Sequence, residues 1–150
     1  MVRSRYSYRT DPAVPAFPDD RDLVVFDGDC ALCSALARMI LRRDRRGRFR
    51  VAPALSPLGR ALYAHFGLDP QDPSSMLLLQ DGRAVLRSDA VIAISEGLGG
   101  VGRLATVARV VPRSWRDAAY GWVAHNRLRF QTDAPRCALT PEADPDRILQ

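Results

Sequence analysis

Two cysteines separated by two residues, Cys30 and Cys33, are the side chains of this sequence that are best suited to chemistry. A Cys-x-x-Cys pair can cycle between a dithiol and a disulfide, and it can also bind a metal ion. The pair follows a short apolar run at residues 23–26 and stands where a helical apolar pattern begins, at Ala31. At a helix start, unpaired backbone N–H groups and the helix dipole stabilise a thiolate. This placement predicts that Cys30 attacks a substrate and that Cys33, one turn further along, resolves the mixed disulfide.

Two carboxylates, Asp27 and Asp29, flank the first cysteine. Their negative charges oppose a nearby thiolate, against the effect of the helix start. Asp29 has an alternative role as the N-cap of the helix. Asp27 has an alternative role as a buried acid at the strand end, where it would exchange a proton with Cys33. We therefore predict Cys30, Cys33 and Asp27 as catalytic residues and Asp29 as an auxiliary residue.

The motif must be positioned by a strand before it and a helix after it, and the apolar pattern predicts both. Residues 23–26 are continuously apolar, as in a strand that is buried on both faces. In chain order, the next predicted elements are a helix from residue 31 to near Gly47, a more exposed strand at 48–51, a helix at 58–66, and a hairpin with strands at 76–79 and 84–86. For the helix at 58–66, we predict Ser56 as the N-cap, Pro57 as the first residue and Gly67 as the end.

These elements predict an α/β protein with a thioredoxin-like core. Strand, helix and strand imply a right-handed parallel crossover, and the turn at Asp81-Gly82 implies an antiparallel pair. Ser88 or Asp89 is predicted to cap a third helix. The resulting order, β-α-β-α-β-β-α, places the cysteine pair where that fold has its redox site. Helices at 104–111 and 115–126 predict a C-terminal helical extension, with its tryptophans in core or groove packing.

The length of 150 residues is typical of one domain. Residues 1–21 combine prolines with charges and are predicted to form a flexible N-terminal arm, so a single thioredoxin-like domain is expected at residues 22–150. The arm holds no apolar run of signal-peptide length, and we expect no membrane span anywhere in the chain. The expected compartment is the cytoplasm, where thiols stay reduced.

Every one of the 22 basic residues is an arginine, and the net charge is +5. The absence of lysine excludes mechanisms that need a Schiff-base or phosphate-binding lysine. Arginines gather at residues 42–50, near the expected C-terminal end of the first helix, where cations are favoured. We therefore expect a solvated helix end, and no nucleic-acid partner.

A zinc site is one alternative use of the cysteines. Its four ligands would be Cys30, Cys33, Cys137 and either His65 or His125. A second Cys-x-x-Cys pair is lacking, and both histidines are expected at the surface or at helix ends, so we predict no metal site. Cys137, in the C-terminal tail, is an exposed thiol or an auxiliary redox partner that reaches back to the pair.

Two further alternatives belong to other functional classes. The strand followed by Asp27-x-Asp29 resembles the first motif of haloacid-dehalogenase phosphatases, but the chain has no lysine and no later Asp-Asp pair. The cysteines could also be packed as small apolar side chains in a redox-inert interaction or structural domain.

Residues 27–33, followed by the run 42–49, resemble the DCC family of thiol-disulfide oxidoreductases, which is named for its Asp, Cys and Cys. Later segments are similar to that family in the same order: Asp81-Gly82-Arg83, Arg87-Ser88-Asp89-Ala90, Val111-Pro112-Arg113, Arg116-Asp117, Asn126-Arg127 and Cys137 near Pro141. The resemblance covers residues 22–149. It implies a thioredoxin-like fold and thiol-disulfide oxidoreductase activity.

The sequence departs from thioredoxin itself at two places. The cysteines enclose Ala31-Leu32 rather than Gly-Pro, and Ser74 or Ser75 stands where thioredoxins carry a cis-proline, with Pro73 just upstream. We predict an oxidoreductase that uses a Cys30–Cys33 dithiol/disulfide couple and needs no bound cofactor. Its expected partner is a protein or small-molecule thiol or disulfide.

Overall fold

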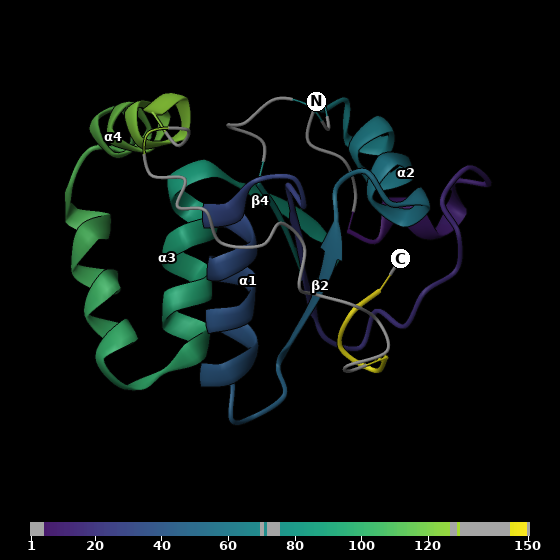
Figure 1. The fold of residues 1–150 in the computed structure, drawn as a ribbon, viewed down its shortest axis with the longest axis horizontal. Helices are drawn as coiled ribbons and strands as arrows, with labels where there is room; N and C mark the ends of the chain where they lie inside the picture. Colours follow the sequence, from purple (N-terminus) through teal and green to yellow (C-terminus); the bar gives the residue numbers. More distant parts are fainter. Residues whose placement is uncertain (1–4, 70, 72–75, 127–128, 130–144, 150) are drawn as a thin grey trace.

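The computed structural model describes residues 5–69, 71, 76–126, 129 and 145–149. It forms a mixed α/β fold around a four-stranded sheet (Figure 1). In chain order, the elements are η1 (Ser7–Thr10), β1 (Asp22–Phe26), α1 (Ala31–Arg43), β2 (Phe49–Pro53), α2 (Pro57–Phe66), β3 (Leu77–Gln80), β4 (Arg83–Leu86), α3 (Arg87–Leu98), η2 (Gly100–Val110) and α4 (Arg113–Asn126), where η marks a 3-10 helix.

The sheet has the strand order β2-β1-β3-β4. β1 pairs in parallel with β2 and antiparallel with β3, and β3 and β4 form the predicted hairpin. The order β1-α1-β2-α2-β3-β4-α3 confirms the predicted α/β class and is compatible with a thioredoxin-like core. All residues of β1 are buried, as its continuous apolar run predicted.

Helices cover both faces of the sheet, with α1 and α3 side by side on one face and α2 on the other (Figure 1). Because successive side chains of a strand point to opposite faces, β1 contributes to two cores. Val24 and Phe26 belong to the core that includes residues of α1 and α3. Leu23 and Val25 belong to the core that includes residues of α2. This double burial fixes the end of β1, and therefore the origin of the loop that follows it.

The boundaries of α2 are as predicted. The Ser56 hydroxyl accepts a hydrogen bond from the Gly59 N–H at 3.1 Å, and Pro57 is the first helical residue. Gly67 ends the helix with φ +69°, a left-handed conformation that favours glycine.

α1 is shorter than predicted, because it ends at Arg43 and not near Gly47. The buried carboxylate of Asp44 accepts hydrogen bonds from the Phe49 N–H at 2.8 Å and from the Arg147 guanidinium at 2.7 Å. Asp44 therefore joins the end of α1 to β2 and to the C-terminal segment. The end of α1 at Asp44 could not be predicted, because its partner Arg147 lies about a hundred residues away in the sequence.

β2 was expected to be more exposed than β1, but the difference is small, because only its last residue, Pro53, is partly exposed. Arg50, in the middle of β2, is 4% exposed, and its guanidinium donates to the Asp146 carbonyl at 2.8 Å and to the Asp20 carboxylate. Ile148 forms a parallel bridge with Val51. Segments from both ends of the chain thus cover this edge of the sheet.

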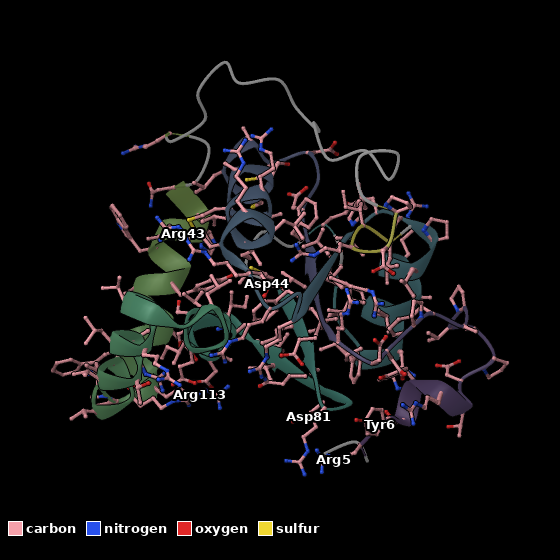
Figure 2. All side chains as sticks on the ribbon, turned by 90° about the horizontal axis from the view of Figure 1, so that it is seen from below. Arg5, Tyr6, Arg43, Asp44, Asp81 and Arg113 are labelled. Carbon is pink, nitrogen blue, oxygen red and sulfur yellow. The ribbon has the colours of Figure 1, made fainter. Side chains whose placement is uncertain are left out.

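Residues 5–21 lie against the sheet and α2. Tyr8 is 3% exposed and packs in the core on the α2 side. The Tyr6 N–H donates to the Gly82 carbonyl at 2.9 Å, and Arg5 forms an ion pair with Asp81 at the hairpin turn (Figure 2). The arm thus adds side chains to the core of the domain. The division into an arm at 1–21 and a domain at 22–150 stays a prediction.

η2 and α4 pack on α3 and form an outer layer (Figure 1). Trp115 and Trp122 of α4 are 72% and 62% exposed, so the prediction that they pack in a core or groove is wrong. The prediction that Ser88 or Asp89 caps α3 is also wrong: the N-cap is Leu86, with no side-chain hydrogen bond. No helix in the described ranges is long and apolar enough to cross a membrane.

Candidate functional site

The cysteine motif lies at the end of β1, where the chain turns into α1. Cys30 is the N-cap residue of α1 and has an extended backbone, with φ −91° and ψ 117°. Its Sγ accepts a hydrogen bond from the Cys33 N–H at 3.3 Å, and its carbonyl accepts one from the Ser34 N–H at 2.9 Å. The first sulfur of the motif therefore accepts a hydrogen bond from one of the N–H groups that a helix start leaves without a backbone partner.

Asp27 shapes the loop before the helix. Its Oδ1 accepts a hydrogen bond from the Asp29 N–H at 3.0 Å, and its carbonyl accepts one from the Cys30 N–H at 3.3 Å. The Asp27 residue is half-buried, whereas the sequence predicted a buried acid. Asp29 is exposed and does not cap α1, because Cys30 occupies the N-cap position itself. The loop geometry thus depends on Asp27.

The two cysteines differ in exposure. Cys30 is 2% exposed, whereas Cys33 is half-buried and packs against the core on the α1 side. In this conformation, Cys33 is the more accessible thiol and Cys30 is the one with the helix-start hydrogen bond.

Ser34 is a residue of the site that the sequence analysis missed. It is 1% exposed, and its hydroxyl donates to the Gly28 carbonyl at 3.3 Å. This bond fastens the loop to the first turn of α1 from inside. Its position, four residues after Cys30 and so on the same helix face, is a signal that could have identified it.

α3 starts at the same end of the sheet strands as the cysteine motif. Val25, next to the end of β1, pairs with Leu77 at the start of β3, and Leu77 pairs with Leu86 at the end of β4. α3 begins at the next residue, Arg87, so α1 and α3 start at the same end of the strands (Figure 1). The predicted counterparts of the thioredoxin cis-proline, Ser74 and Ser75, lie outside the described residues.

Polar side chains at the start of α3 bind α4. The Ser88 hydroxyl donates to the Asp117 carboxylate and holds the pKa of that carboxyl below its ordinary value. Asp89 accepts a hydrogen bond from Arg116 at 2.8 Å and forms an ion pair with Arg113 at 3.2 Å. This cluster holds α4 on the start of α3, at the end of the sheet where the cysteine motif lies.

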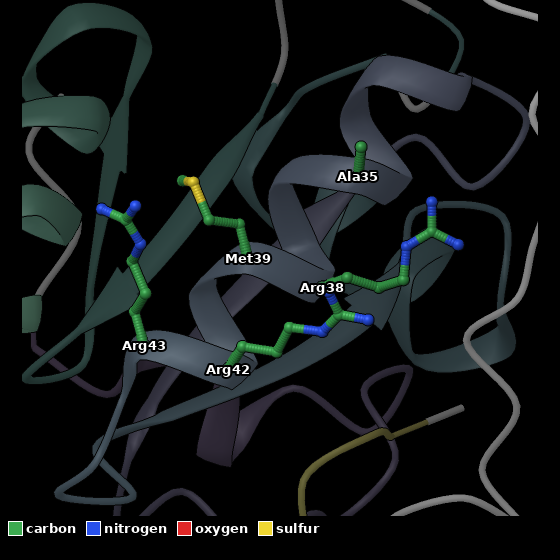
Figure 3. Close-up of a pocket in the computed structure, with 5 residues that line it drawn as sticks. All are labelled: Ala35, Arg38, Met39, Arg42 and Arg43. Carbon is green, nitrogen blue, oxygen red and sulfur yellow. The ribbon is translucent and has the colours of Figure 1, made fainter.

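The outer face of α1 carries the start of the arginine-rich run. Ala35, Arg38, Met39, Arg42 and Arg43 line a pocket of about 500 Å³ on this face (Figure 3). Arg42 and Arg43 are exposed, as expected for a solvated helix end. Arg50, from the same run, is buried in β2.

The residues of the zinc alternative do not meet in the described part of the chain, where no group of three or more His, Cys, Asp or Glu side chains could hold a metal ion. Of the two positions expected for His65, the surface or a helix end, the structure shows the helix end: it is 7% exposed and lies in the last turn of α2. Its ring nitrogens contact Ser7 at 2.8 Å and Asp11. Cys137 lies outside the described residues.

Comparison with known proteins gives two kinds of match. The family model described as DCC1-like thiol-disulfide oxidoreductase matches residues 24–133. The uncharacterized protein YuxK of Bacillus subtilis is 29% identical over 127 residues, which cover 85% of this chain and 93% of that protein. A chloroplastic DCC family protein of Arabidopsis thaliana is 30% identical over 122 residues, which cover 81% of this chain and 71% of that protein. No solved structure matches the chain.

Proposed function

This chain belongs to the DCC1-like thiol-disulfide oxidoreductase family, and from this we propose that Cys30 and Cys33 form a dithiol/disulfide couple that exchanges electrons with thiol or disulfide substrates. The substrates are protein or small-molecule thiols and disulfides. The proposed compartment is the cytoplasm, whose reducing conditions return the couple to the dithiol.

One observation carries the proposal. The Cys33 N–H donates to the Cys30 Sγ at 3.3 Å across the first turn of α1. This contact brings the two cysteines together within the first turn of a helix, where Cys33 lies in position to attack a mixed disulfide on Cys30. A pair of cysteines packed only as apolar side chains would not need a hydrogen bond to the sulfur.

In the reductive direction, the Cys30 thiolate attacks one sulfur of a substrate disulfide. A bond forms between Cys30 and that sulfur, the substrate S–S bond breaks, and the leaving thiolate takes up a proton. Cys33, as a thiolate, then attacks the Cys30 Sγ, so the Cys30–Cys33 disulfide forms and the second substrate thiol leaves. Two electrons pass from the protein to the substrate. The same steps in reverse oxidise a substrate dithiol.

Cys30 is 2% exposed, so the first step requires a local movement that exposes its sulfur, and we assign this movement to the adjacent loop at residues 27–29. Such loops are held mainly by a few hydrogen bonds, and here Asp27 supplies two of them, through its side chain and its carbonyl. Asp27 is therefore proposed as a positioning residue for Cys30, besides the proton exchange with Cys33 that the sequence predicted. Asp29 and Cys137 are proposed as auxiliary residues.

Trapping of mixed disulfides tests both the couple and the order of attack. The Cys33→Ser variant, treated with a peptide disulfide, is expected to accumulate an adduct on Cys30, located by peptide mass mapping. The Cys30→Ser variant is the matched control and is expected to accumulate little adduct. An adduct only on Cys33 would reverse the order of attack, and the absence of an adduct on either cysteine would contradict the proposed function.

A further inference from the structure

The outer layer of the molecule exposes an apolar surface that the redox chemistry does not use. Eight of the eleven exposed large apolar side chains of the described residues belong to residues 101–123. They are Val101, Leu104, Val107, Val110, Val111, Trp115, Trp122 and Val123. We call this set the outer apolar face. A soluble monomer rarely exposes such a concentration of large apolar side chains without a binding partner.

The geometry of η2 gathers half of this set into one stripe. A 3-10 helix has 3.0 residues per turn, so residues three apart lie directly above one another. Val101, Leu104, Val107 and Val110 follow this spacing and are 79%, 67%, 66% and 85% exposed. With a rise of roughly 2 Å per residue, the stripe is about 18 Å long.

A second side of η2 packs on α3, and side chains of the third, exposed side form hydrogen bonds with α3. Gly102, Ala105 and Ala108 are partly buried, and a Cβ at position 102 would collide with the carbonyl of Ser95 in α3. Thr106 and Arg109 donate to the Glu96 carboxylate at 3.0 Å. η2 is therefore held on α3 in one rotational setting, and in that setting the apolar stripe points outward.

The charges around the outer apolar face are positive. Residues 100–126 hold four arginines and one aspartate, a net charge of +3 with histidine neutral. The side chains of Arg109 and Arg113 are 47% and 65% exposed, whereas those of their partners Glu96 and Asp117 are only 29% and 20% exposed. The acidic groups lie inward and the guanidinium groups outward. The surface thus combines exposed aliphatic side chains and tryptophans with a basic rim.

We propose that η2 and α4 form a membrane-docking surface that lies on an anionic lipid bilayer, with the outer apolar face in the interfacial region. Exposed tryptophans and aliphatic side chains next to arginines are the composition of helices that lie in this region. The chain's net charge of +5 attracts it to anionic lipid. A second copy of the chain would instead bring two basic rims together. The proposal does not depend on the redox activity of the cysteines.

Vesicle binding by the full chain tests the proposal. The probes are vesicles of phosphatidylcholine and phosphatidylglycerol in equal parts, and vesicles of phosphatidylcholine alone. We expect co-sedimentation with the anionic vesicles and a weaker association with the neutral ones. Trp115 and Trp122 are the two tryptophans of the chain, so their emission should shift to shorter wavelength when the surface enters the lipid.

A double variant locates the surface. Leu104→Glu with Val107→Glu is expected to lower the partition coefficient at least about tenfold, because it places charges in the apolar stripe. The matched control is Leu36→Glu with Met39→Glu, which makes the same change in charge at exposed apolar side chains of α1. We expect this control to keep most of the binding. Circular dichroism verifies that both variants are folded.

Three results would overturn the proposal. The first is absence of binding to anionic vesicles by the wild-type chain. The second is an equal loss of binding in both double variants, which would show a general effect of charge. The third is a wild-type chain that forms a dimer, detected by light scattering, and does not bind vesicles. If the Leu104→Glu/Val107→Glu variant is then a monomer, the outer apolar face binds a second copy of the chain.

Discussion

Two helices, α1 and α3, start at the same end of the sheet strands, but the side chains at their starts have different hydrogen-bond partners. At the start of α1, the Cys30 sulfur accepts a hydrogen bond from the helix's own backbone. At the start of α3, no side chain caps the helix, and Ser88 and Asp89 bind residues of α4. The first residues of α1 thus bond to a cysteine sulfur, whereas those of α3 bond to a neighbouring helix. The comparison shows that a short polar residue near a helix start does not by itself indicate a cap.

Substitutions at the start of α1 should lower the rate of thiol–disulfide exchange far more than a substitution at the start of α3. Cys30→Ser and Cys33→Ser should each lower the rate of exchange with oxidised glutathione at least about a hundredfold, because a hydroxyl does not replace the thiolate. Ser88→Ala, at the start of α3, is the matched control and should keep the rate within about twofold. Comparable losses in all three variants would remove the functional difference between the two helix starts.

The next effect concerns stability and is expected at α3. Asp89→Ala removes a hydrogen bond with Arg116 and an ion pair with Arg113, and it should lower the free energy of unfolding by about 1–2 kcal/mol. Urea denaturation measures it. Arg103→Ala, at an exposed position of η2, is the control and should change stability by less than about 0.5 kcal/mol. An unchanged stability in Asp89→Ala would mean that this cluster does not hold α4.

A smaller effect on activity is expected from the loop before α1. Asp27→Asn keeps an oxygen that accepts from the Asp29 N–H, whereas Asp27→Ala loses it. If Asp27 positions Cys30, the alanine variant should react roughly tenfold more slowly and the asparagine variant almost normally. If Asp27 exchanges a proton with Cys33, both variants should be slow, and their pH–rate profiles should lose a titration step.

The smallest effect compares two substitutions at one position. Serine is a favourable N-cap and alanine is not, so Cys30→Ala should be less stable than Cys30→Ser by about 1 kcal/mol. Thermal denaturation of the two inactive variants measures this difference. Equal stabilities would show that the side chain of residue 30 does not cap α1 in solution.

Features set by neighbouring residues could be predicted from the sequence. β1 follows from its apolar run, the hairpin from Asp81-Gly82, and α2 from its Ser56 cap and Gly67 end. The position of the cysteine pair at the start of α1 follows from the change in apolar spacing at Ala31. These signals are local because strands, turns and caps depend on residues within a few positions of one another.

Features set by distant partners could not be predicted. Arg50 alternates with apolar residues like an exposed side chain, yet Asp146 and Asp20 bury it. Ser88 and Asp89 have the composition of a cap, yet their partners lie in α4. Only the folded chain brings such groups together, so a sequence pattern gives the type of residue but not its contacts.

The exposure of the outer layer, η2 and α4, also depends on contacts between distant residues and could not be predicted. The helical spacing of Trp115 and Trp122 identifies a helix face but does not say whether anything covers it. The burial of Cys30 was left open as well, because its position in the sequence fits both a reactive thiol and a cysteine packed as a small apolar side chain.

A redox titration tests whether Cys30 and Cys33 form a dithiol/disulfide couple. The protein, as wild type and as Cys137→Ser, is equilibrated in graded thiol–disulfide buffers, and alkylated thiols are counted by mass. We expect one reversible two-electron transition, in which Cys30 and Cys33 lose their alkylation together in both proteins. A pair that never closes, or oxidation confined to Cys137 in the wild type, would contradict it.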